Sequence, residues 1–193
     1  TVAHGLNTAP NWYVVKRLDD TGSWFVYHSE MASDAETDYI RFNNAAAKSD
    51  DATLWGDTAP TSTVFSVSTA FNSSEELLFY AGHNVYGFSK FGVFSGNSAA
   101  NGAFVYCGFK PARIWLKRSD SSTVDWTSYD LKREGFNQEN DSLRMATAGQ
   151  EQADDDLDIL SNGFKMRRNM ANNQGDVLFF AWADSPFKFA NAR

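Results

Sequence analysis

The feature that most constrains the fold is an internal repeat at a spacing of about 100 residues. The segment Pro10–Arg17 is matched by Pro111–Arg118, and each is followed by an aspartate and then by a tryptophan, Trp24 or Trp126. Two later pairs of segments match in the same order, residues 77–81 with 177–181 and residues 87–91 with 186–189. Self-similarity at a fixed period indicates one supersecondary unit used more than once. The sequence therefore predicts two copies of one unit, roughly residues 1–95 and 96–193.

Within each unit, the apolar residues favour short β-strands over helices. β-Branched and aromatic residues gather in short runs, and clusters of Ser, Thr, Asn, Asp and Gly separate these runs. Strands of this length with polar turns are typical of an all-β sandwich or barrel. The polar stretches Ser29–Asp57 and Asp130–Asp156 are expected to be long loops with at most a brief helical turn. The expected strands are Trp12–Lys16, Trp24–Tyr27, Val64–Val67, Leu77–Tyr80, Phe88–Phe94, Arg113–Lys117, Trp126–Tyr129, Phe164–Met166, Val177–Trp182 and Phe187–Phe189.

Two repeated units can form two small sandwiches or share one core. A unit of about 95 residues makes a marginal independent core. No proline-rich or charge-rich linker separates the units, and the segment Gly96–Gly102 is typical of an inter-strand loop. We therefore favour one pseudo-symmetric β-sandwich domain over residues 1–193.

Composition and charge exclude several classes of protein. Hydrophobic residues make up 42% of the chain and aromatic residues 15%, which excludes a disordered chain. The net charge of −7 disfavours a nucleic-acid partner, and no apolar run is long enough to predict membrane insertion. The single cysteine, Cys107, allows neither an intrachain disulfide nor a multi-thiolate metal site. We expect no cofactor.

The histidines do not form a recognisable catalytic or metal-binding motif. His4, His28 and His83 are far apart in the sequence, and none has the spacing of a metal-binding pair. No Gly-x-Ser-x-Gly nucleophile motif accompanies them. We therefore predict turn or interface histidines, no catalytic residues and no metal site.

Carboxylates occur in several clusters, and the sequence pattern identifies none of them as a catalytic pair. Glycosidase chemistry needs two carboxylates close together in a cleft. The candidates are Asp19-Asp20, Asp50-Asp51, Glu75-Glu76 and the acidic run Asp154–Asp158. Loop carboxylates in that last run leave calcium binding open, although the run lacks the ligand pattern of an EF-hand.

Matching places in the repeat suggest structural roles for the prominent aromatic and basic residues. Trp24 and Trp126 are expected to be buried packing residues, whereas Trp55 is the best candidate for an aromatic side chain on a loop, with packing as the alternative. Lys16-Arg17 and Lys117-Arg118 end equivalent strands, where a strand-end ion pair is favoured over an anion or glycan contact. Phe88–Phe91 and Phe187–Phe189 are expected to belong to core-facing sheet.

Several ordered motifs resemble a known family. They are His4-Gly5-Leu6, Thr58–Phe65, Gly87–Gly92, Phe104-Val105-Tyr106, Gly108–Ala112, Leu160–Lys165 and Pro186–Arg193. Together they resemble a β-module of the tail-fibre or appendage proteins of marine and cyanobacterial tailed phages. The resemblance implies a lectin-like jelly-roll β-sandwich at the C-terminal part of a longer virion protein. It also implies a homo-oligomer, with a trimer favoured, next to other virion proteins.

The function that this resemblance implies is non-enzymatic attachment to a host-surface glycan or protein from the virion surface. The alternatives are a capsid decoration or fibre protein, an architectural spacer and, from another class, a glycan depolymerase. The binding residues stay unknown at this stage. Receptor contacts are expected in Ser29–Asp50 and Lys132–Ala153, and replacing either stretch should change binding without changing the melting temperature.

Overall fold

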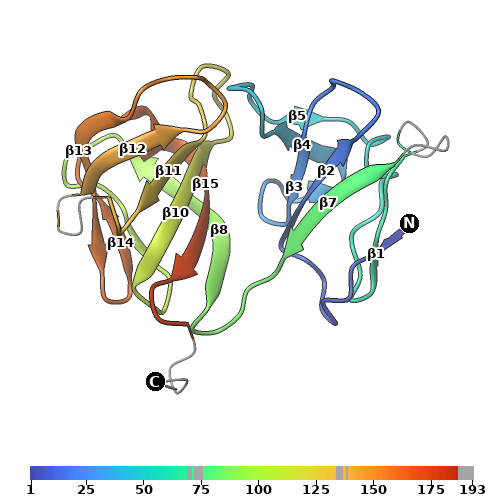
Figure 1. The fold of residues 1–193 in the computed structure, drawn as a ribbon, viewed down its shortest axis with the longest axis horizontal. Coiled ribbons are helices and arrows are strands. Elements are labelled where there is room, and N and C mark those ends of the chain that lie inside the picture. The colour runs from blue at the N-terminus through green and yellow to red at the C-terminus, as the bar shows by residue number, and fades with distance from the viewer. Residues whose placement is uncertain (69–70, 72–75, 134–136, 138, 187–193) are drawn as a thin grey trace.

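The computed structural model describes residues 1–68, 71, 76–133, 137 and 139–186, and it confirms the all-β prediction. The described residues contain no α-helix; short 3₁₀ helices include Ala35–Thr37 and Ala171–Asn173. The expected strand Phe187–Phe189 lies outside the described residues. Figure 1 shows two halves side by side, with β1–β7 in one and β8–β15 in the other.

The strands form three antiparallel sheets, none of which closes on itself. The N-terminal half contains a two-stranded sheet, β1-β6, and a five-stranded sheet ordered β5-β4-β3-β2-β7. Its strands are β1 (Val2–Ala3), β2 (Trp12–Arg17), β3 (Phe25–His28), β4 (Asp38–Arg41), β5 (Ser49–Asp50), β6 (Val64–Phe65) and β7 (Leu77–Gly82).

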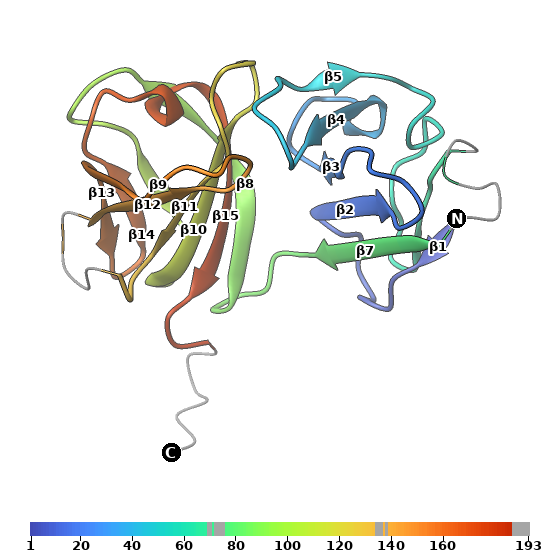
Figure 2. The same ribbon diagram turned by 45° about the horizontal axis from the view of Figure 1, so that its top comes forward.

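The C-terminal half is one eight-stranded sheet ordered β8-β15-β10-β11-β12-β13-β14-β9, and its strands curl around a core of their own (Figure 2). Its strands are β8 (Ser89–Asn97), β9 (Phe104–Tyr106), β10 (Pro111–Arg118), β11 (Thr127–Asp130), β12 (Glu139–Arg144), β13 (Gln152–Leu160), β14 (Gly163–Met166) and β15 (Gln174–Ala183).

The central strands are apolar on both faces because each face is covered. In β2, Tyr13 and Val15 enter the core of the N-terminal half, whereas Trp12 and Val14 face the C-terminal half. Strand β15 repeats this arrangement, with Phe179 inside its own half and Phe180 turned toward the other. Successive side chains of a strand point to opposite faces, so a continuous apolar run indicates a strand between two layers.

Three apolar clusters hold the molecule together. One lies within each half, around Tyr13 and Trp55 in the first and around Tyr129 and Phe164 in the second. The third joins the halves where the outer face of β2-β3-β4 packs on β8, β15 and β10. Its members include Val14, Val26, Ile40, Phe91, Trp126, Leu178 and Phe180. Whether the two halves count as one domain stays a prediction; the proposed boundary at residue 95 falls within β8.

Hydrogen bonds also cross between the halves. The Trp126 indole Nε1–H donates to the Arg41 carbonyl oxygen at 2.8 Å, and the Lys48 amide donates to the Ser119 carbonyl oxygen at the same distance. A third bond between the halves runs from the Val93 amide, which donates to a Glu30 carboxylate oxygen at 3.2 Å. These directional bonds define how the apolar faces align.

The prediction of two long loops is wrong in part, although the expected brief helical turn is present as Ala35–Thr37. The stretch Ser29–Asp57 contains β4 and β5, and Ile40 of β4 is fully buried. The stretch Asp130–Asp156 contains β12 and the first part of β13. These strands were not recognised in the sequence because they contain many polar residues. A strand with one solvated face lacks a continuous apolar run. Replacing either stretch as a whole would remove a sheet strand and lower the melting temperature.

The burial of the two repeat-matched tryptophans differs, which yields a stability prediction. Trp126 is 1% exposed, whereas Trp24 is only partly buried, which corrects its expected role. We expect Trp126→Ala to lower the free energy of unfolding by about 3–5 kcal/mol and Trp24→Ala by less than half of that. Urea denaturation of both variants measures the difference, and equal losses would contradict this assignment of burial.

Candidate functional site

The most distinctive surface feature is an aromatic groove where the two halves meet. Its volume is about 280 Å³, close to the lower end of the range of about 300–1,000 Å³ for ligand pockets. No charged side chain lines it. The lining residues, called the aromatic groove below, are Trp12, Val14, Trp24, Val26, Phe42, Tyr80, Trp115, Trp126 and Phe180.

Both sheets contribute rings to this groove, and Phe180 of β15 lies at its base. Its ring centroid is 5.5 Å from that of Trp12 and 5.6 Å from that of Trp126. Phe42, which follows β4, lies 5.6 Å from Trp115. Tilted and edge-to-face arrangements of this kind are the favourable geometry for aromatic pairs. The groove walls are therefore packed against one another.

Two polar groups of the groove residues lack a partner. The indole N–H groups of Trp12 and Trp115 are buried, and no acceptor for either exists among the described residues. The Trp12 indole lies across Gly82, where a Cβ atom would be 2.5 Å from Nε1, so a larger residue at position 82 would displace the ring. A buried donor without an acceptor costs about 1–3 kcal/mol. Both N–H groups are buried within the walls, so the accessible surface of the groove is apolar.

The rim of the groove is accessible. Tyr80 of β7 is 54% exposed although its neighbours in the groove are mostly covered. A shallow depression continues from Trp24 and Phe42 to Asn43 and Met145. Asn43 lies in the stretch Ser29–Asp50 and Met145 in Lys132–Ala153, so both predicted receptor segments contribute to this depression. An extended ligand can therefore cover the groove and its neighbouring surface together.

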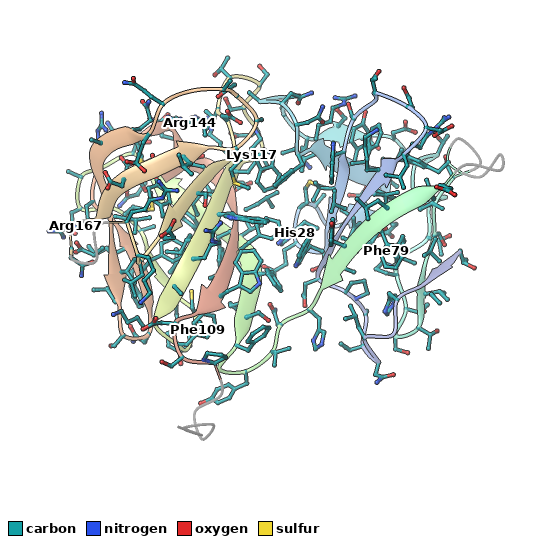
Figure 3. All side chains as sticks on the ribbon, in the orientation of Figure 1. His28, Phe79, Phe109, Lys117, Arg144 and Arg167 are labelled. Atoms are coloured by element: carbon teal, nitrogen blue, oxygen red, sulfur yellow. The ribbon has the colours of Figure 1, made fainter. Side chains whose placement is uncertain are left out.

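The three histidines lie apart, and one of them is a core residue. His28 is fully buried between the halves, next to Phe180 at 5.3 Å (Figure 3). Burial lowers its pKa to about 3, so the ring is neutral, and its Nδ1 accepts a hydrogen bond from the Glu30 amide. His4 is partly buried and bonds to the Thr61 carbonyl oxygen. The described residues hold no cluster of three or more potential metal ligands.

Four of the carboxylates considered above, Asp19, Asp51, Asp156 and Asp158, contact neighbouring side chains. The acidic run lies in strand β13 rather than in a loop, and the side chains of Asp154 and Asp155 are outside the described residues, as is Glu75. The Tyr129 hydroxyl donates to Asp156 at 2.6 Å, and Asp158 lies 3.3 Å from Arg167. Asp19 pairs with Arg17, and Asp51 accepts bonds from Thr53.

Both basic pairs have the structural role that the repeat suggests. Arg17 pairs with Asp19 at 3.0 Å, and Arg118 pairs with Asp120 at 2.6 Å. Lys16 donates to the carbonyl oxygens of Arg17 and Asp20. Lys117 is fully buried where the halves meet, as Figure 3 shows. Its ammonium group donates to the carbonyl oxygens of Ala45 (3.0 Å), Ser121 (3.2 Å) and Val124 (2.6 Å), so it joins the halves.

The remaining aromatic candidates are packing residues. Trp55 is fully buried in the N-terminal half and donates to the Asp38 carbonyl oxygen at 2.8 Å, which resolves its two alternatives in favour of packing. Phe91 is buried between the halves, but Phe88 is 37% exposed. Sequence reasoning missed Trp12, Phe42, Tyr80 and Trp115 as groove residues. These residues belong to runs that are apolar on both faces of a strand. Such a run indicates burial, but it does not show where two packed layers leave a groove between them.

Comparison with known proteins identifies one relationship. A family described as "Domain of unknown function (DUF7483)" matches residues 1–186. No curated protein and no solved structure matches the chain. Among the described residues, no helix is long and apolar enough to cross a membrane.

Because Lys117 is buried, we expect its contribution to the free energy of unfolding to increase as the pH rises above 8. Desolvation lowers its pKa to about 8 against the opposing effect of Asp125 and Asp120, whereas an unfolded lysine titrates near 10.4. Between these values the unfolded chain binds more protons, so the free energy of unfolding rises with pH. We expect the difference in unfolding free energy between the wild type and Lys117→Met to shift in favour of the wild type from pH 8 to pH 10.5. Denaturant titrations at several pH values measure it, and a flat difference would contradict the assignment.

Proposed function

The chain belongs to the DUF7483 family, and from that premise we propose that it is a non-enzymatic attachment module of a tailed-phage virion. The aromatic groove is the site at which it contacts a host-surface glycan. The module is carried on the particle surface as part of a tail fibre or appendage, in a homo-oligomer for which the phage resemblance favours a trimer. The proposal rests on that resemblance for its setting and on the groove for its ligand.

The observation that carries the glycan assignment is the chemistry of the groove. Seven of its nine lining residues are aromatic, and the exposed ring of Tyr80 stands at its rim. Pyranose rings have an apolar C–H face that stacks on aromatic rings, and their hydroxyl groups accept hydrogen bonds. The aromatic lining supplies the stacking surface, and the exposed side chain of Asn43 in the neighbouring depression can bond to such hydroxyl groups.

We also propose that the two halves are copies of one unit. The strand order β5-β4-β3-β2-β7 corresponds to β13-β12-β11-β10-β15, and β1-β6 corresponds to β9-β14. The pairing Val2↔Phe65 has its counterpart in Val105↔Phe164, at positions that also match in sequence. These correspondences support the repeat. The lectin-like jelly-roll topology stays a prediction.

A matched pair of tyrosines tests the groove. We expect Tyr80→Ala to weaken binding of the fluorescently labelled protein to host cells by at least about tenfold, because burying one face of an aromatic ring contributes on the order of 1.5 kcal/mol or more. Tyr86 is 78% exposed and does not line the groove, so Tyr86→Ala serves as the control and should bind normally. Trp115→Phe, which removes only the indole N–H and ring bulk, should give a smaller loss.

Periodate treatment of the host cells distinguishes the ligand class. Loss of saturable binding after periodate oxidation of vicinal diols supports a glycan ligand, whereas retained binding points to a protein receptor. A folded sample that binds no host cell would favour a decorating or architectural role. Shortening of the host polysaccharide on incubation would favour a depolymerase and overturn the non-enzymatic assignment.

A further inference from the structure

The free edge of the five-stranded sheet is β7, which Figure 2 shows at the end of the series β5, β4, β3, β2 and β7. The Leu18 amide donates to the Glu76 carbonyl oxygen, and the pairs Lys16↔Leu78 and Val14↔Tyr80 follow in register. Backbone groups alternate along an antiparallel strand. Those of Leu78 and Tyr80 therefore face β2, and those of Leu77, Phe79 and Ala81 point outward. No described residue pairs with this outer edge.

The equivalent edge of the C-terminal half is covered. The Ala183 amide donates to the Phe88 carbonyl oxygen, and in the same register Val177, Phe179 and Ala181 turn their backbone groups toward β8. These three residues correspond in the repeat to Leu77, Phe79 and Ala81. Strand β8 has no counterpart among the described residues of the N-terminal half. The edge of β7 is therefore the vacant equivalent of the position that β8 fills.

Side-chain exposure agrees with a missing strand. Phe180, opposite Phe91 of β8, is 1% exposed, whereas its counterpart Tyr80 is 54% exposed. A strand beside β7 would place a residue opposite Tyr80 and cover the edge of its ring that faces away from β2. An unpaired strand with exposed aromatic character is a template for pairing with another chain.

The chain itself contains a sequence that suits this edge. The segment Gly87–Phe91 that begins β8 is matched by Pro186–Phe189 near the C-terminus. When Phe189 takes the place of Phe91, it lies opposite Tyr80, and Arg193 lies opposite the exposed Glu76. We propose that residues 187–193 of a second copy of this chain add as a strand to the outer edge of β7. This inference rests on the two-unit repeat proposed above and does not depend on glycan binding.

Such an interface is heterologous, because the donor and acceptor surfaces differ. Each copy has one donor segment and one acceptor edge, so the contact either closes into a ring or continues as a filament. A closed ring of three copies is compatible with the trimer that the phage resemblance favours. Main-chain hydrogen bonds supply the affinity in β-strand addition, and side chains such as Phe189 and Arg193 supply specificity.

Two variants that each remove one side of the contact test the proposal. The first ends at Pro186 and lacks the donor, and the second is Ala81→Pro, which removes an outward N–H and leaves the bonds to β2 in place. By sedimentation velocity, the full chain should self-associate with rising concentration, and each variant alone should be monomeric. Mixing the two variants should give a one-to-one dimer and nothing larger, because one still has the donor and the other still has the edge.

Controls separate this result from misfolding and from glycan binding. Tyr106→Pro places proline at an exposed residue of β9, an end of the eight-stranded sheet, and this variant should associate like the wild type. Glu76→Lys should weaken association about two- to fivefold, and Arg193→Glu in the same chain should restore it. A monomeric full chain, association that survives truncation at Pro186, or a mixture that forms no dimer would each overturn the proposal. The truncated chain keeps every groove residue, so its host-cell binding reports on the proposed function separately.

Discussion

The packing of two aromatic sheet faces, centred on Phe180, is the contact on which the rest of the structure depends. Phe180 lies against Trp12 and His28 of one half and against Phe91, Trp115 and Trp126 of its own. Because this face is buried, β2 and β15 can be apolar on both sides without exposing a large apolar surface. The aromatic groove is the part of the same interface that the side chains leave unfilled. The contact between the halves and the aromatic groove therefore have one cause.

Polar contacts at the margin of this interface determine its alignment. Apolar packing is not directional, so flat aromatic faces alone would permit the sheets to slide. The Trp126 indole bond to the Arg41 carbonyl and the three carbonyl bonds of Lys117 fix one arrangement. Burying the Lys117 ammonium costs desolvation energy, as its lowered pKa shows, and the carbonyl oxygens offset that cost. These contacts therefore hold the two walls of the groove in position.

The two halves differ in whether a strand covers the edge of the sheet, and this difference is the basis of the proposed assembly. In the C-terminal half, β8 covers the edge of β15, and the amides on its own outer edge at Phe91 and Val93 are bonded to Asn84 and Glu30. The edge of β7 has no such cover among the described residues. Under the proposed repeat, this edge is the acceptor for one further strand. The proposed attachment and the proposed self-assembly use separate surfaces of the N-terminal half, the groove face of the sheet and its edge, which meet at Tyr80.

The sequence by itself determined the all-β class, the positions of β2, β3, β7, β10, β11 and β15, and the ion pairs that end β2 and β10. Period-two patterns and repeated apolar runs carry that information locally. It did not reveal β4, β5, β12 or the acidic strand β13, whose polar residues resemble loops when their partners are unknown. Only the tertiary structure decided that Trp55 is packed, that Lys117 joins the halves, and that Trp12, Tyr80 and Trp115 line one groove. Alternation along a strand shows which side chains share a face, but what lies opposite that face depends on how distant strands pack.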